Sequence, residues 1–135
     1  MYTVAKSMAR SMAVMGVAVA AALAVLLTSN PASADGSWSN HQTTIISRDA
    51  GLYIGTLEVA VWTQNIPASY HARVWGPGFS VDTKSEYVGA FRTYRDWVKV
   101  DRVFAEGAVI CAEGWRYNGH GYDSIGLPCF TVTRT

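Results

Sequence analysis

The sequence has little of what metal-binding and cofactor-binding sites require. Its 135 residues include two cysteines and three histidines, His41, His71 and His120, which are spread along the chain. Two cysteines alone do not make a tetrahedral zinc site, and no histidine has a partner at metal-ligand spacing. A nucleophile elbow, a phosphate-binding loop and a dinucleotide fingerprint are also absent from the sequence. We therefore expect no metal ion and no cofactor.

Charge is scarce in the first part of the chain. Within residues 1–34 only Lys6 and Arg10 are charged, and residues 13–27 form a continuous apolar run. The segment ends in Ala32-Ser33-Ala34, a small-residue cleavage site. These features predict a secretory signal peptide and a secreted, extracellular protein. An uncleaved membrane anchor is the alternative, but the apolar run is shorter than the about 20 residues that a membrane span needs.

The remaining residues, 35–135, lack methionine and any excess of charge. Without Lys6 and Arg10, nine basic residues stand against ten acidic ones, a formal charge of −1. This balance offers no electrostatic attraction to nucleic acid or to an anionic membrane surface. Aromatic residues are plentiful instead, because all five tryptophans and all four phenylalanines lie here. A segment of this length makes a single domain.

The spacing of apolar residues predicts an all-β domain. Apolar and polar residues alternate in three stretches that we expect to be strands, 52–63, 69–75 and 97–104. Short strands are also expected at 43–48 and 79–81. Short strands joined by a loop suit residues 87–97 better than a helix. The polar arm at 35–42 is expected to be loose unless Trp38 pins it. Regular spacing of short strands predicts a small antiparallel β-sandwich of about seven strands, with a small barrel as the alternative.

Both cysteines lie in a predicted C-terminal hairpin. The β-rich runs 108–117 and 122–132 flank a glycine-rich break, Asn118-Gly119-His120-Gly121. A two-residue turn would leave Cys111 and Cys129 about 10 Å out of register along the strands. That offset exceeds the about 7 Å between Cα atoms that a disulfide spans.

A three-residue loop solves this problem, because it places Asn118 opposite Tyr122 and the two cysteines opposite each other. We therefore expect a Cys111–Cys129 disulfide with Gly121 in the left-handed conformation; two free, buried thiols are the alternative. Pro128 has no N–H, so we also expect a bulge or a break at residues 126–128.

The tryptophans are the candidate binding residues. By alternation, Trp62, Trp75 and Trp97 fall on the polar side of their strands, and Arg73 lies beside Trp75. Exposed tryptophan on a rigid sheet offers apolar area with a polar handle, which suits the binding of an extracellular protein or glycan. Burial of each ring against a loop or the other sheet is the alternative. Trp115 shares a face with the predicted disulfide, so we expect it in the core.

Catalysis has weak support in the sequence. His120 and Asp123 are one candidate acid–base pair, and the carboxylates Glu58, Glu106 and Glu113 are candidates for a glycosidase pair. No spacing selects these residues, and a turn or a solvated surface explains each of them. We therefore expect a protein that is not an enzyme.

Three functions remain open. The first is a secreted, non-catalytic binding module that uses an aromatic sheet face. The second is an inhibitor of an extracellular hydrolase that presents the hairpin tip, Asn118, Gly119, His120 and Gly121, which the disulfide would preorganise. The third is a secreted antimicrobial or envelope-active protein. A cluster of exposed tryptophans would favour the first function, and a projecting tip with buried tryptophans would favour the second.

Three segments of the chain, 71–78, 109–115 and 125–129, resemble small secreted proteins of actinobacteria. The resemblance implies a secreted bacterial protein. Those proteins have no assigned activity, so the resemblance carries no functional residue to this chain. Residues 35–38, Asp-Gly-Ser-Trp, are similar to the start of secreted β-sandwich bacteriocins.

Overall fold

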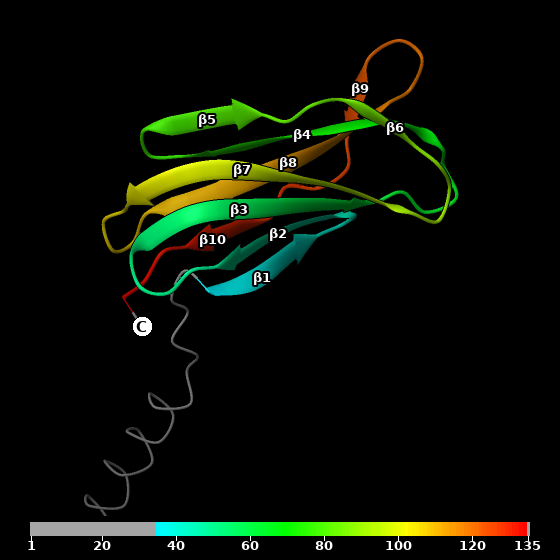
Figure 1. Ribbon diagram of the computed structural model, residues 1–135. Coiled ribbons are helices and arrows are strands. Elements are labelled where there is room, and N and C mark those ends of the chain that lie inside the picture. Colours follow the sequence, from blue (N-terminus) through cyan, green and yellow to red (C-terminus); the bar gives the residue numbers. More distant parts are fainter. Residues whose placement is uncertain (1–34, 135) are drawn as a thin grey trace, which may run out of the picture. The chain divides into compact units, whose positions relative to one another are not determined.

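The structure is a computed structural model, and it describes residues 35–134; the predicted signal peptide lies outside the described residues. Ten strands form two antiparallel sheets, and the described residues contain no helix (Figure 1). In chain order the strands are β1 (Asp35–Asn40), β2 (Thr43–Arg48), β3 (Tyr53–Trp62), β4 (Ala68–Gly76), β5 (Phe79–Asp82), β6 (Glu86–Val88), β7 (Thr93–Val103), β8 (Val109–Tyr117), β9 (Tyr122–Ser124) and β10 (Cys129–Thr131). Within residues 35–134 there is no helix long and apolar enough to cross a membrane.

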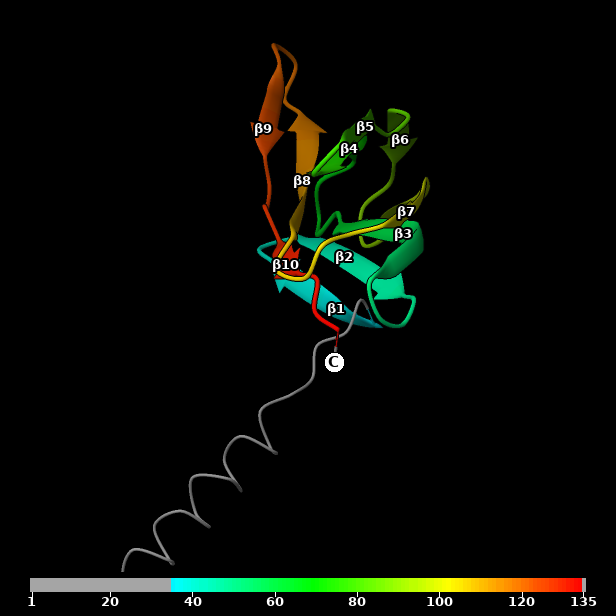
Figure 2. The same cartoon turned by 90° about the vertical axis from the view of Figure 1, so that its left-hand side faces the viewer.

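The two sheets form the two layers of a sandwich (Figure 2). The first sheet has the order β1-β2-β3-β7, and the second has the order β10-β8-β4-β5. In the second sheet, β5 and β6 pair with different parts of β4, and β9 and β10 pair with different parts of β8. The predicted β-sandwich is confirmed, but the number of strands is ten rather than seven.

Two interruptions, between β5 and β6 and between β9 and β10, account for part of this difference in strand number, because each divides one edge of the second sheet into two short strands. Between β5 and β6, Thr83 takes the place of a strand residue, since its N–H donates to the Ala72 carbonyl at 2.8 Å and its hydroxyl accepts from the Ala72 N–H at 2.8 Å. Between β9 and β10, Gly114 bonds to two successive residues, accepting from the Ile125 N–H at 2.8 Å and donating to the Gly126 carbonyl at 3.0 Å. Two residues opposite one define a bulge.

The N-terminal arm supplies the remaining strand; it is not loose, because the stated exception, anchoring by Trp38, applies. β1 pairs with β2 along its whole length, from Asp35 opposite Arg48 to Asn40 opposite Thr43. Trp38 holds the strand on the sandwich, because its ring stacks on Phe130 with centroids 4.1 Å apart and planes within 10°. The aromatic anchor outweighs the polar, turn-forming composition of the arm.

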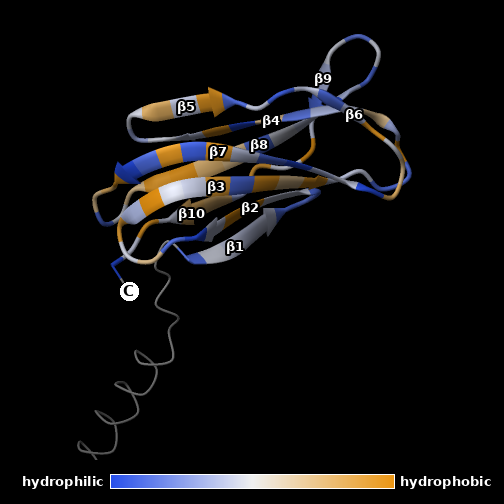
Figure 3. Ribbon diagram, viewed as in Figure 1, coloured by the Kyte–Doolittle hydropathy of each residue, from blue (hydrophilic) through white to orange (hydrophobic). Residues whose placement is uncertain are grey.

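The core lies between the sheets and follows the predicted alternation. Apolar and polar bands alternate along β7 (Figure 3), where Val98 and Val100 point inward. One position differs from the prediction. A register shift between Ile54 and Thr56 turns Ile54 into the core and leaves Tyr53 44% exposed, whereas strict alternation counted back from the buried Leu57 would turn Tyr53 inward. A bulge adds one residue and so exchanges the faces on either side of it.

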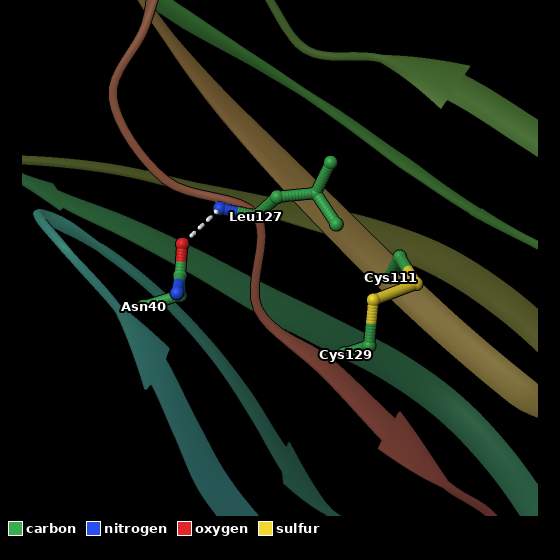
Figure 4. Close-up of a disulfide and its surroundings, with 4 residues drawn as sticks. All are labelled: Asn40, Cys111, Leu127 and Cys129. Carbon is green, nitrogen blue, oxygen red and sulfur yellow. Dashed lines mark hydrogen bonds between the residues drawn. A yellow bond between two sulfur atoms is a disulfide. The ribbon is translucent and has the colours of Figure 1, made fainter.

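The predicted disulfide is confirmed. Cys111 on β8 lies directly opposite Cys129 on β10, with Cα atoms 4.0 Å apart (Figure 4). Beside the pair, the Ala112 N–H donates to the Pro128 carbonyl at 2.9 Å, so Pro128 joins the ladder as an acceptor. The predicted break at residues 126–128 is confirmed as well.

The turn of the hairpin differs from the prediction by one residue. Tyr117, not Asn118, lies opposite Tyr122, and Gly119, not Gly121, has a positive φ, of 96°. The bulge at Gly126 then adds the residue that returns the two cysteines to register. The correct cysteine pairing was thus reached with a wrong turn, because a one-residue error at the tip is cancelled at the bulge.

Candidate functional site

The four predicted binding residues lie on opposite sides of the sandwich. Trp62 and Trp97 lie on the outer face of the first sheet and are 45% and 58% exposed. Trp75 is half-buried on the outer face of the second sheet, opposite Cys111, and Arg73 lies on the same face. The structure therefore brings together two of the three predicted tryptophans.

Trp115 also lies on the outer face of the second sheet, so its predicted place in the core was wrong. The inward positions of β8 are taken by Ile110, Ala112 and Gly114, all of them buried. At Gly114 the sheets approach so closely that an added Cβ would lie 2.2 Å from the Thr43 hydroxyl oxygen. Side chains alternate along a strand, so Trp115, which follows the inward Gly114, points outward.

We call the outer face of the first sheet the tryptophan face and define it by Arg48, Glu58, Trp62, Arg95 and Trp97. Cross-strand pairing sets its layout: Trp62 lies opposite Thr93, Ala60 opposite Arg95, and Glu58 opposite Trp97. The two tryptophans therefore lie four residues apart along the β3–β7 pair, about 13 Å at the usual rise of a strand.

At the centre of the tryptophan face, Glu58 holds two arginines. Its side chain is 5% exposed, and its two oxygens bind Arg48 Nη1, at 3.1 Å, and Arg95 Nη1. The arginine side chains are 74% and 50% exposed. Each guanidinium has five N–H donors, so both keep donors that face the solvent beside Trp97. A buried carboxylate thus fixes two exposed cationic groups on a rigid sheet.

A hollow of about 300 Å³, the Trp97 hollow, lies next to Trp97 on the tryptophan face; its lining includes Arg48, Asp49, Tyr53, Thr56, Glu58 and Trp97. The Asp49 carboxylate is oriented by the Gly55 N–H, which donates to Oδ2 at 2.9 Å. The Tyr53 hydroxyl donates to Asp101 Oδ1 at 2.5 Å, and this hydrogen bond is the main cause that raises the Tyr53 pKa. Hydrogen-bond donors and acceptors therefore both lie beside the exposed ring of Trp97.

On the outer face of the second sheet, the polar and aromatic side chains contact one another. Arg73 and Asp82 form an ion pair at 2.8 Å. The Tyr122 ring meets the His71 ring edge-on, with centroids 4.4 Å apart, and Trp115 lies on the same imidazole at 6.3 Å. Burial lowers the His71 pKa, the nearby Asp82 raises it by less, and Arg73 lowers it slightly.

The hairpin tip projects beyond the neighbouring strands in both views (Figures 1 and 2). Asn118 closes it: its backbone N–H donates to the Gly121 carbonyl at 2.9 Å, and its side-chain oxygen accepts from the His120 and Gly121 N–H groups at 2.9 Å each. The Asn118 side-chain amide donates to Asp123 at 3.0 Å. The tip is therefore a tight, internally bonded turn.

The structure does not bring together His120 with Asp123, or Glu58 with Glu113. The Asp123 carboxylate accepts a hydrogen bond from the Asn118 side chain and lies 3.9 Å from Arg116. Among the described residues it accepts no hydrogen bond from His120. Glu58 lies on the first sheet's outer face, whereas Glu113 accepts a hydrogen bond from Ser124 on the second sheet's outer face. Among residues 35–134 no group of three or more His, Cys, Asp or Glu is placed to hold a metal ion.

Comparisons of the chain with models of protein families, with curated proteins and with solved structures give no significant match.

Sequence reasoning missed the polar half of this site. It named Trp62 and Trp97 from alternation alone, but it treated Glu58 as a solvated carboxylate and did not single out Arg48 or Asp49. The available signal was a carboxylate within the strongly apolar strand of residues 57–61. A charged residue in such a strand requires a partner.

Proposed function

We propose that this chain is a secreted, non-catalytic binding module whose ligand lies on the tryptophan face. The observation that carries the proposal is the pair of exposed tryptophans, Trp62 and Trp97, on one rigid sheet face. Each indole leaves a large apolar area in water, and aromatic anchors of this kind dominate the binding energy of many interfaces.

The polar groups between the two rings support the same proposal. Glu58 fixes the donors of Arg48 and Arg95 before any ligand arrives, and β3 and β7 hold the rings on paired strands. Groups that are already ordered lose little conformational entropy on binding. A face with fixed aromatic and fixed polar groups is therefore suited to recognition.

Arrays of extracellular proteins and glycans, probed with the full chain expressed in a bacterial host, test the proposal. The variants are Trp62→Ala, Trp97→Ala and both together, with Tyr117→Ala as the matched control. Tyr117 is an aromatic residue on the outer face of the second sheet, and at 43% it is about as exposed as Trp62. We expect signals that the double variant loses and Y117A keeps. Signals that survive in the double variant contradict the proposed face.

The projecting hairpin tip supports a second candidate, an inhibitor of an extracellular hydrolase. Its geometry restricts how such an inhibitor would act. The four residues 118–121 form a closed turn, whereas substrate-like segments are bound as extended strands. The tip would therefore block a cleft as a wedge. Hydrolase assays with His120→Ala test this candidate, and unchanged inhibition by that variant contradicts it.

A further inference from the structure

The Trp97 hollow offers both donors and acceptors of hydrogen bonds. Arg48 presents N–H donors, the oriented Asp49 carboxylate presents acceptors, and the exposed Thr56 hydroxyl does both. A carboxylate or phosphate ligand would use donors alone, and an ammonium ligand would use acceptors alone. A set of hydroxyl groups, each of which donates and accepts, uses all three side chains.

Charges of both signs alternate around the Trp97 hollow. The cationic residues Arg48, Arg95 and Lys99 stand against Asp49, Glu58 and Asp101, and Asp35 lies opposite Arg48 on β1. This mixture makes no surface of one sign that would attract a polyanion or a polycation. A purely apolar ligand would bury these polar groups without partners, which is costly. The ligand that fits is neutral and polar.

The exposed Trp97 ring supplies a platform for an apolar surface. A pyranose ring has such a surface, since its axial C–H groups lie on one face and its hydroxyl groups point outward around the rim. A volume of about 300 Å³ is at the lower end of small-molecule pockets. This size suits one sugar ring.

Trp62 lies about 13 Å farther along the β3–β7 pair, at the usual strand rise, with Arg95 between the two tryptophans. A second platform at that distance is of use only to a ligand that is long and extended. Binding of a chain across both platforms would be tighter than binding of one ring.

Resting on the proposed function, we infer that the Trp97 hollow is a subsite for one ring of a neutral, extended oligosaccharide or polysaccharide. In this arrangement Trp97 stacks on the ring, and Arg48, Asp49 and Thr56 bind its hydroxyl groups. Glu58 is a positioning residue, because its oxygens hold the arginines. Trp62 contacts another ring of the same chain.

Extension of the first sheet by a second copy of this chain is hindered, because the β7 edge is partly blocked. The Trp97 N–H donates to Asp96 Oδ1 at 2.8 Å, and the other Asp96 oxygen accepts from the Lys84 N–H at 3.3 Å. A side chain that takes up a backbone donor of an edge strand hinders pairing with another strand.

The test uses pull-down with insoluble cellulose and chitin and affinity electrophoresis with soluble xylan and β-glucan. Polygalacturonate and heparin serve as the charged probes. Calorimetry with a disaccharide and a hexasaccharide of any polysaccharide that binds then measures affinity. We expect the protein to bind a neutral polysaccharide. In W97A the affinity for both oligosaccharides should fall by about tenfold or more. W62A should weaken the binding of the hexasaccharide alone, and Y117A should change neither affinity.

The variants Arg48→Ala and Asp49→Asn keep the experiment decisive if W97A does not fold. We expect each of them to lower the affinity for both oligosaccharides. Glu58→Gln should weaken binding with the same dependence on chain length as R48A. Wild-type affinity in W97A, R48A and D49N overturns the subsite, and a loss in W62A would then leave the proposed function standing. Binding to charged polysaccharides only, or to none, overturns the inference as well. The protein array decides the proposed function separately.

Discussion

The side-chain oxygen of Asn40 accepts a hydrogen bond from the backbone N–H of Leu127 at 2.8 Å, across 87 residues of sequence (Figure 4). It joins the end of β1 to the break between β9 and β10, and therefore one sheet to the other. The Gln42 N–H and the Thr43 hydroxyl both donate to the Ile125 carbonyl, at 3.1 Å each. This corner is a fixed junction between the two layers.

Gly126 makes the close approach at this junction possible, which leads to a prediction. It has a φ of 142°, and a Cβ there would lie 2.2 Å from the Asn40 carbonyl oxygen. We expect Gly126→Ala to lower the free energy of unfolding by about 3 kcal/mol or more, because backbone must move to relieve the clash. Denaturant unfolding followed by tryptophan fluorescence measures the change.

Gly107→Ala is the matched control for that variant. Gly107 also has a positive φ, of 89°, but nothing lies within 4 Å of the position of a Cβ. It should show the cost of the backbone conformation alone, about 1 kcal/mol. Equal losses in the two variants would mean that the junction at Asn40 contributes nothing.

The junction also shows how far the sequence predicts this fold. Alternation identified the strands around Leu57, Val74 and Val98, because burial between two sheets leaves a local period of two. It missed β1, since Trp38 is one aromatic residue among polar ones and its partner Phe130 lies 92 residues away. Contacts of that range leave no local pattern.

The disulfide provides a second prediction. Replacing both Cys111 and Cys129 by Ala should lower the free energy of unfolding by about 3 kcal/mol, because the bridge closes a loop with a sequence separation of 18. Wild-type protein unfolded with and without a reducing agent should show the same difference. An unchanged midpoint in the double variant would show that the hairpin is held by its ladder and core contacts alone.

The arginine clamp provides a third prediction. Glu58→Gln removes the charge that holds Arg48 and Arg95, and we expect a loss of about 1–2 kcal/mol in unfolding free energy. The loss stays moderate because both arginines are largely exposed to water. The matched control is Asp82→Asn, which breaks an ion pair between exposed side chains and should cost less than about 0.5 kcal/mol. A smaller loss for E58Q than for D82N would contradict the role of the clamp.

The candidate site was only half predictable for a related reason. The outward parity of Trp62 and Trp97 is a local property of each strand, so alternation revealed it. The ion pairs of Glu58 depend on which strands are neighbours, and the sequence does not fix the order β2-β3-β7. Trp75 shows the same limit, because parity placed it on an outer face but did not say on which sheet.

The fourth prediction concerns His71, whose pKa is lowered mainly by burial under Tyr122 and Trp115. The folded protein therefore binds a proton at His71 less readily than the unfolded chain does. Stability from this group is fully present above the ordinary histidine pKa of about 6.5. It is lost as the pH falls from there through the lowered value in the folded protein. Asp82 lies nearby, but its own pKa is lowered by Arg73, so it titrates at more acidic pH.

Denaturant unfolding at a series of pH values from 8 to 5 tests this prediction. The wild-type free energy of unfolding should decrease toward pH 5, and His71→Gln should flatten that decrease. The control is His120→Gln at the exposed hairpin tip, which should leave the wild-type slope unchanged. The buried Nδ1 of His71 has no hydrogen-bond partner among the described residues, so no hydrogen bond at that atom favours its protonation. A slope in H71Q as steep as in the wild-type protein would place the pH dependence at another group.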